Sequence, residues 1–189
     1  MNSIYIIALL SVFTLSFGRV SSDEYILWTK ERKLEWVDFN GIVDEKSRFK
    51  AICSSYIEYE GLEINGDELS ISVSCYFDKS KSWIRKNEKS NYLLNHEQRH
   101  FDIGEIFARK FRKEISLINN ASLKNIQETL NSINSKILKE KISFNKKYDE
   151  ETKHSIEKSV QKKWDKKVDN LLDSLKNYSN PIVKIKIEP

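Results

Sequence analysis

The chain has 189 residues, of which 32 are basic and 28 acidic, for a formal net charge of +4 at pH 7. This length suits one domain with its own hydrophobic core. The 39% hydrophobic content excludes a disordered chain, and only 5 glycines and 2 prolines argue against a loop-rich β-sandwich. Nucleic acid is not expected as a partner, because the nearly balanced charges offer no clustered basic groove.

The N-terminus has the pattern of a secretory signal peptide. Residues Ile4 to Phe17 form an uncharged, mostly apolar run of 14 residues, shorter than the ~20 residues that cross a bilayer. Small residues before Asp23 offer a cleavage site. We therefore expect residues 1–22 to be a cleaved signal peptide and residues 23–189 to be one secreted or periplasmic domain without a stable membrane span. An uncleaved anchor or an N-terminal core helix is the alternative.

The first part of the expected domain favours β-structure. Residues 70–77 alternate between polar and apolar side chains, as in a half-buried strand, and the Asn65-Gly66 pair before them predicts a hairpin turn. The hairpin would bring Cys53 and Cys75 within a few rungs of each other. After export they could form a disulfide, and two buried thiols are an equally good interpretation.

From about residue 90 the apolar spacing becomes helical. We expect helices over residues 91–117, 121–145 and 155–175, and a last strand in the alternating residues 182–187. The predicted fold is α+β, with a small N-terminal antiparallel β-sheet followed by a three-helix segment. The short apolar seam of the second helix indicates internal packing, so we expect a monomer.

The first helix carries an H-E-x-x-H motif in residues His96 to His100. At ~100° per residue, the two histidines project from the same face one turn apart. Both can then place a nitrogen ~2.0–2.1 Å from one zinc ion. Glu97 lies beside them, where it can reach a water on the metal without displacing it. The motif predicts Zn²⁺ as the cofactor, with His96 and His100 as ligands.

The helical wheel predicts which way the motif faces. Apolar side chains flank the histidine pair, which turns it toward the interior, and the opposite side of the helix is expected in solvent. Two core histidines without a metal are the alternative. The flanking apolar residues are Leu93, Ile103, Phe107 and Phe111, and the expected solvated residues are Gln98, Glu105 and Arg109.

A catalytic zinc ion needs a third protein ligand and an open position. On the same helix, Asp102 and Glu105 project away from the two histidines. The remaining histidine of the chain is His154, at the expected junction between the second and third helices. An up-down-up arrangement returns this junction to the start of the first helix. His154 is therefore the predicted third ligand, and Asp149 is the alternative.

Residues 93–103, around the motif, resemble an uncharacterised bacterial family of predicted secreted zinc-dependent proteases. This resemblance implies a zincin-like fold and supports His154 as the third ligand, but it brings no known substrate. Ser155 departs from the family pattern, which has glycine after the histidine. Further blocks similar to family motifs follow in the same order: residues 34–41 (L-x-W-x-D-F-x-G), Ser82-Trp83, residues 148–154 (Y-D-x-x-T-x-H), and Gln161 with Trp164.

The expected activity is hydrolysis of peptide bonds in a peptide or protein substrate. Zinc would lower the pKa of its water toward ~7, and Glu97 would take the proton and pass it to the leaving amine. Tyr148 is the candidate oxyanion donor because it is close in sequence to His154, with Arg99 or another tyrosine as alternatives. A metzincin is excluded because Met1 is the chain's one methionine.

Two other function classes remain open at this point. One is a non-catalytic zinc-binding envelope or binding module on a zincin scaffold, which predicts bound zinc without turnover. The other is a helical protein without a metal, which predicts no zinc at all. Intact Glu97 favours the enzyme, because a scaffold without catalysis has no chemical need of that carboxylate.

Overall fold

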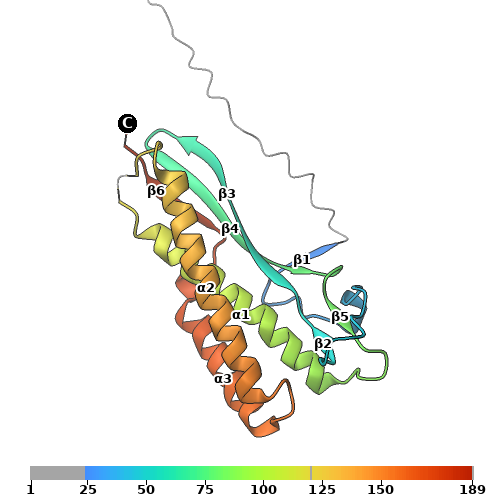
Figure 1. Cartoon of the computed structure of the whole chain (residues 1–189). Coiled ribbons are helices and arrows are strands. Elements are labelled where there is room, and N and C mark those ends of the chain that lie inside the picture. Colours follow the sequence, from blue (N-terminus) through green and yellow to red (C-terminus); the bar gives the residue numbers. More distant parts are fainter. Residues whose placement is uncertain (1–23, 120, 189) are drawn as a thin grey trace, which may run out of the picture.

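The computed structural model describes residues 24–119 and 121–188, so the expected signal peptide lies outside the described residues. The architecture is α+β, an N-terminal antiparallel sheet followed by three helices, which confirms the predicted fold class (Figure 1). The strands are β1 (Tyr25–Leu27), β2 (Ala51–Ile52), β3 (Ser55–Asn65), β4 (Glu68–Asp78), β5 (Trp83–Ile84) and β6 (Ile182–Lys186); the helices are α1 (Asn91–Ser116), α2 (Ile126–Thr152) and α3 (Lys158–Ser174), with short 3₁₀ turns at Trp36–Asp38 and Lys176–Tyr178.

Strand β4 is the centre of the main sheet. It pairs with β3 along one edge, while β1 and β6 share its other edge. The predicted hairpin turn is confirmed: Gly66 adopts φ +62°, the left-handed region open to glycine, and Asn65 pairs with Glu68. The expected C-terminal strand is also present as β6, and β2 and β5 form a separate two-stranded pair.

The alternation in β4 buries the side chains on one face of this strand. Ile71, Val73, Cys75 and Phe77 are all fully buried, as the period of two predicted. Cys75 pairs with Ile57, whereas Cys53 precedes β3, and both cysteines are free thiols. The cysteines are therefore thiols and not a disulfide, but only Cys75 is buried, because Cys53 is half-buried.

Helix α1 is the central helix of the molecule. It packs against β3, β4 and β6 on one side and against α2 and α3 on the other (Figure 1). The prediction of a solvated face was therefore wrong: Gln98, Glu105 and Arg109 are all buried. An amphipathic pattern describes one covered face, but here neighbours cover α1 all round, and the polar residues are satisfied by ion pairs and hydrogen bonds.

Helix α2 begins and ends later than the sequence predicted. It starts at Ile126 and not at residue 121, and it continues to Thr152 instead of ending at Asn145. The side-chain amide of Asn145 donates to the carbonyl of Lys141, within the helix. The charged residues that follow can form ion pairs one turn apart, such as Lys146 with Glu150 at 3.7 Å. Such pairs stabilise a helix, so the helix continues past Asn145. None of the helices in the described residues is long and apolar enough to span a membrane.

Gly104 lies where α1 packs tightly against β3 and β4. A Cβ at this position would lie 2.6 Å from the Cys75 sulfur and 3.1 Å from the Ser55 hydroxyl. Gly104→Ala is therefore expected to lower the free energy of unfolding by about 1–3 kcal/mol, as overpacking does in well-filled cores. Urea denaturation measures the loss.

Two controls separate this clash from the general effect of adding a methyl group. Gly61→Ala places its Cβ where no atom lies within 4 Å, so it should leave stability nearly unchanged. Adding Cys75→Ala to Gly104→Ala should recover part of the loss, because it removes the atom in closest contact. A Gly104→Ala variant as stable as Gly61→Ala would show that the helix can move away from the sheet at no cost.

Candidate metal centre

Three side chains from two helices converge at one end of the molecule. His96 and His100 lie one turn apart on α1, and Asp149 lies near the C-terminal end of α2. The Oδ1 atom of Asp149 is 3.2 Å from Nε2 of His96 and 3.0 Å from Nε2 of His100. All three ligand atoms lie within 4.8 Å of one another. The three residues form a group that could hold a metal ion.

A second pair of contacts fixes which ring nitrogens face the centre. Nδ1 of His96 lies 2.9 Å from Oε1 of Gln161, and Nδ1 of His100 lies 2.7 Å from Oδ1 of Asn145. The orientation of each amide is set by its own donors. Gln161 donates to the hydroxyl of Tyr148 at 2.6 Å, and Asn145 donates to a backbone carbonyl at 3.1 Å. Both histidines therefore face an acceptor with Nδ1, which must carry the proton.

The tautomer follows from these acceptors. With its proton on Nδ1, a neutral imidazole presents the Nε2 lone pair, and at this site both lone pairs point at the carboxylate of Asp149. Each Nε2 atom lies 3.0–3.2 Å from the carboxylate oxygen of Asp149. At this distance the nitrogen lone pair and the negatively charged oxygen repel each other unless a positive charge lies between them. A proton can provide this charge, and so can a metal ion.

The pKa shifts agree with this electrostatic picture. Burial acts to lower the pKa of His100, but the hydrogen bond and charge of Asp149 outweigh it and raise the pKa to about 9. Burial likewise disfavours the Asp149 carboxylate, yet the hydrogen bonds from His100 and His96 hold its pKa well below the usual range. The centre is thus built to keep a positive charge against the carboxylate.

The donor set fits a small divalent transition metal. Two imidazole nitrogens and one carboxylate oxygen are ligands that suit zinc and its neighbours. Two ligand atoms of a tetrahedral zinc ion, each bonded at ~2.0–2.1 Å, lie ~3.3 Å apart. The distances of 3.0 and 3.2 Å from Asp149 Oδ1 to the two imidazoles are close to that spacing.

Glu97 lies beside the group at the bottom of a cleft. The residue is 3% exposed and lines the cleft opposite Cys53. Burial raises the pKa of Glu97, and His100 and His96 act to lower it. The carboxylate therefore lies next to the metal group, and its buried environment favours taking up a proton.

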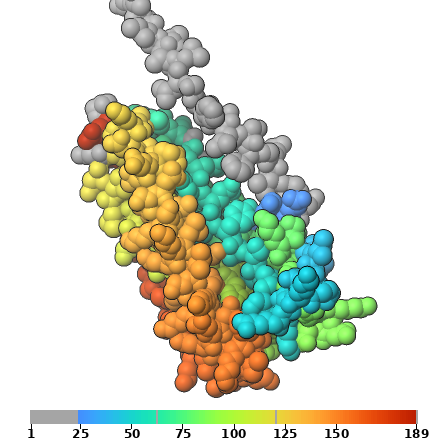
Figure 2. Space-filling view, viewed as in Figure 1, coloured from blue at the N-terminus to red at the C-terminus, as the bar shows by residue number. Residues whose placement is uncertain are grey.

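The cleft has a volume of about 470 Å³ and opens between α1, α2 and the segment of residues 49–55, which includes β2. His96, Glu97, His100 and Asp149 line it from the helices, and His154 lines it from the turn after α2. Figure 2 shows the blue and cyan segment around β2 lying against the orange end of α2. The metal group is therefore accessible to a molecule bound in this cleft.

His154, the predicted third ligand, lies at the edge of the same site. Its Nδ1 is 3.5 Å from Oδ1 of Asp149, its ring packs on Phe49 at 4.7 Å between centroids, and its side chain is 37% exposed. The structure thus brings His154 close to the centre, but the group within mutual ligand distance consists of His96, His100 and Asp149. Asp149 was the alternative third ligand, and the geometry favours it.

Tyr148, the candidate oxyanion donor, packs against the metal-group residue His96. It is fully buried, its ring stacks on that of His96 at 4.7 Å, and its hydroxyl donates to the His96 carbonyl at 3.3 Å. Tyr148 is not among the residues that line the cleft. This placement does not support Tyr148 as the oxyanion donor. The alternative donor Arg99 is not supported either, because its guanidinium is paired with Asp102, Asp165 and Asp169.

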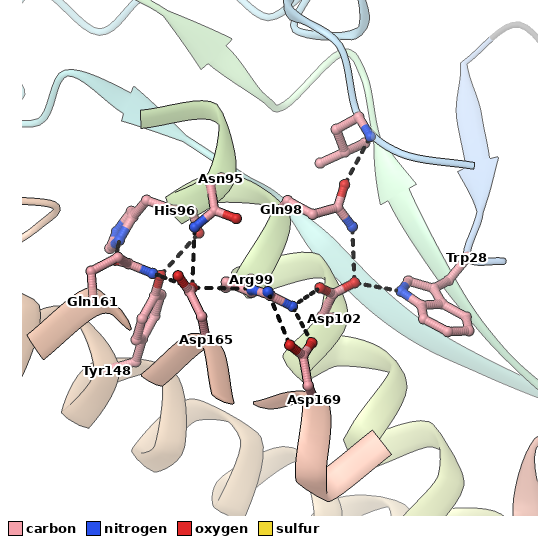
Figure 3. Close-up of polar contacts among 11 residues, drawn as sticks. Trp28, Asn95, His96, Gln98, Arg99, Asp102, Tyr148, Gln161, Asp165 and Asp169 are labelled. Carbon is pink, nitrogen blue, oxygen red and sulfur yellow. Dashed lines mark hydrogen bonds and ion pairs between the residues drawn. The ribbon is translucent and has the colours of Figure 1, made fainter. Parts of the chain in front are cut away.

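A polar network continues from the centre along α1 (Figure 3). Gln161, which contacts His96, also donates to Asp165 at 2.9 Å, and Asp165 accepts from Arg99 at 3.1 Å. Arg99 pairs with Asp102, which in turn accepts from the indole of Trp28 at 2.9 Å. These contacts fix α3 and the end of β1 to the motif helix, so the position of His96 depends on residues far away in the sequence.

Gln161 is expected to determine how tightly the metal is held. Gln161→Leu removes the acceptor for Nδ1 of His96, which should weaken metal affinity about 10- to 100-fold, as loss of such outer partners does in other metal sites. Competition with a chelator measures the dissociation constant. Lys162→Leu, at the exposed neighbouring position, is the control and should leave affinity unchanged. An unchanged affinity in Gln161→Leu would show that the Nδ1 contact does not orient the ligand.

The turn after α2 has an unusual backbone. Lys153, His154 and Ser155 have φ values of 48°, 51° and 70°, a region that is costly for residues with a Cβ. Ser155→Gly should raise the free energy of unfolding by about 0.5–1 kcal/mol, because the strain it removes exceeds the added entropy of the unfolded chain. Thermal unfolding tests this, with Ser155→Ala as the control that should bring no gain. Destabilisation by glycine would mean that the serine side chain stabilises the turn.

Comparison with known proteins gives one finding. Residues 77–155 match the family described as "Bacterial protein of unknown function (DUF922)". This similarity includes both histidines of the motif, Asp149 and His154, but it covers less than half of the chain. No curated protein and no solved structure matches the chain. The possible metal group of this chain thus lies within the part that is similar to a bacterial family of unknown function.

Proposed function

We propose that this chain is a secreted or periplasmic zinc-dependent metallopeptidase. His96, His100 and Asp149 hold the zinc ion, with His154 as the alternative third ligand, and Glu97 is the general base. One observation carries the proposal: both Nε2 lone pairs converge on a carboxylate oxygen at 3.0–3.2 Å, beside a buried glutamate in a cleft. This arrangement matches the chemical needs of metal-assisted hydrolysis.

The roles of the residues follow from their positions. A bound zinc ion supplies a Lewis acid that lowers the pKa of water toward ~7. Glu97 accepts the proton of the attacking water and delivers it to the leaving amine, and its raised pKa, caused by burial, suits a group that holds a proton between these steps. Gln161 and Asn145 keep the two imidazoles in the tautomer and orientation that the metal needs.

The rest of the proposal rests on the sequence and on packing. The apolar run at the N-terminus, Ile4 to Phe17, supports export. The apolar seam of α2 packs internally, with Leu130 and Ile137 buried, which supports a monomer. The substrate is a peptide or protein, bound in the cleft next to the segment of residues 49–55.

Hydrolysis of a peptide mixture tests the proposal. The purified chain with one equivalent of zinc should produce defined fragments, a zinc chelator should stop the reaction, and added zinc should restore it. Mass spectrometry of the fragments shows that amide bonds are cut. A zinc-loaded chain that cleaves nothing would overturn the peptidase and favour a non-catalytic zinc-binding module.

A further inference from the structure

A lysine in the cleft has no acidic partner. Lys141 lies on α2, lines the same cleft as Glu97 and Asp149, and is 8% exposed. Its ammonium group donates to the backbone carbonyl of Ser55 at 2.5 Å. In the part of the chain that the structure describes, it has no carboxylate within 4.0 Å. A buried cation without an anion is costly, so such a position suggests that a ligand provides the anion.

The two other lysines of the cleft differ in this respect. Lys50 pairs with Glu88 at 2.7 Å, and Lys81 pairs with Asp78 at 3.2 Å. Their charges are already matched by the protein, and both side chains are exposed. Lys141 is therefore the cleft lysine that is poised to bind a new anion. Burial lowers its pKa, and an anion bound beside it would raise that pKa again.

The position of Lys141 sets its distance from the metal group. Lys141 precedes Asp149 by two turns on the same helix, which is about 12 Å along the axis at a rise of 1.5 Å per residue. An extended peptide advances about 3.3 Å per residue. A chain lying along the cleft, with one peptide bond at the metal, would thus pass Lys141 after about three or four residues.

We propose that Lys141 binds a carboxylate of the substrate, about three or four residues from the bond that is cut. The carboxylate is either an Asp or Glu side chain or the free C-terminus of the peptide. This inference rests on the proposed peptidase function, because it assigns the substrate class of the same cleft. The ammonium group then exchanges its contact with the Ser55 carbonyl for a charge-assisted hydrogen bond to the substrate.

Cleavage of a random peptide library tests the assignment. The zinc-loaded chain should prefer substrates with an acidic residue at one fixed distance from the cut, or substrates that end there. Amidated and free-acid versions of the library distinguish a side chain from a C-terminus. Lys141→Met should reduce the preference about ten- to hundredfold, the value of a hydrogen bond between charged groups, and Lys141→Glu should shift it toward Lys and Arg.

The controls separate recognition from support of the cleft wall. Lys139→Met, at an exposed position on the same helix, should keep the acidic preference. All variants are first checked for zinc content and thermal stability. If Lys141→Met slows cleavage of acidic and neutral peptides equally, Lys141 only holds the Ser55 segment in place and the proposal is wrong.

A binding experiment keeps this inference independent of catalysis. Paired hexapeptides that differ only in Asp or Asn at one position are titrated into the zinc-loaded chain by calorimetry. Tighter binding of an Asp peptide, lost in Lys141→Met, would uphold the carboxylate site even if the wild-type chain cleaves nothing. Equal affinities for all pairs, and for free and amidated C-termini, would overturn it.

Discussion

Replacing Glu97 with glutamine is expected to lower the rate of peptide hydrolysis about 10²- to 10⁴-fold, the usual contribution of a general acid and base. The amide keeps the size of the side chain but accepts no proton. Because Glu97 lies beside His96 and His100 and not within the metal group, the variant should still bind one zinc ion. Steady-state kinetics and metal analysis of the same preparation measure both quantities.

Glu150→Gln is the control for this experiment. Glu150 follows Asp149 on α2, its side chain is exposed, and its partner is Lys146 at 3.7 Å. The substitution removes the same charge without touching the cleft, so activity should stay the same. A Glu97→Gln variant that keeps zinc and full activity would show that another group takes the proton of the water.

The second large effect concerns stability. Glu105→Gln is expected to lower the free energy of unfolding by about 3–5 kcal/mol, as happens when one member of a buried ion pair is lost. The Glu105 carboxylate lies 2.8 Å from Arg112 and 2.9 Å from Arg109. Glu105 and Arg112 are each 3% exposed. The substitution would leave both guanidinium groups without their anion in the interior. Urea denaturation, with fluorescence of the tryptophans as the signal, measures the change.

An exposed ion pair between α1 and α2 provides the matched control. Glu114 pairs with Lys136 at 3.2 Å, and the two side chains are 40% and 56% exposed. Glu114→Gln should change the free energy of unfolding by less than about 1 kcal/mol. Equal effects of the two substitutions would show that Arg109 and Arg112 are satisfied by backbone carbonyls alone. Arg112, for example, also donates to the carbonyl of Val73 at 2.7 Å.

Local patterns were enough to predict several elements of the fold, including the helix that carries the motif. The Asn65-Gly66 turn, the alternation of β4 and the helical spacing around the H-E-x-x-H motif are all confirmed. Each depends on residues that are near one another in the sequence. The surroundings of α1 could not be predicted in this way. The burial of Gln98 and Arg109 results from elements that meet only in the folded chain.

The surroundings of the metal group show the same limit. Gln161 contacts His96 across 65 positions of sequence, and its place in a family motif gave no hint of this role. Asn145, which contacts His100, was interpreted as the end of a helix. Because α2 continues to Thr152, Asp149 is on a helical face that points at the motif. A helix that ended at residue 145 would place the same aspartate in a loop. On that basis His154 was the predicted third metal ligand.

Metal stoichiometry tests the central claim most directly. Zinc is measured after remetallation in the wild-type chain and in His96→Ala, Asp149→Ala and His154→Ala. The geometry of the site predicts one zinc ion per chain in the wild type and in His154→Ala, and none in the other two variants. Zinc kept by Asp149→Ala but lost from His154→Ala would move the third ligand to His154, and a wild-type chain without zinc would contradict the metal centre altogether.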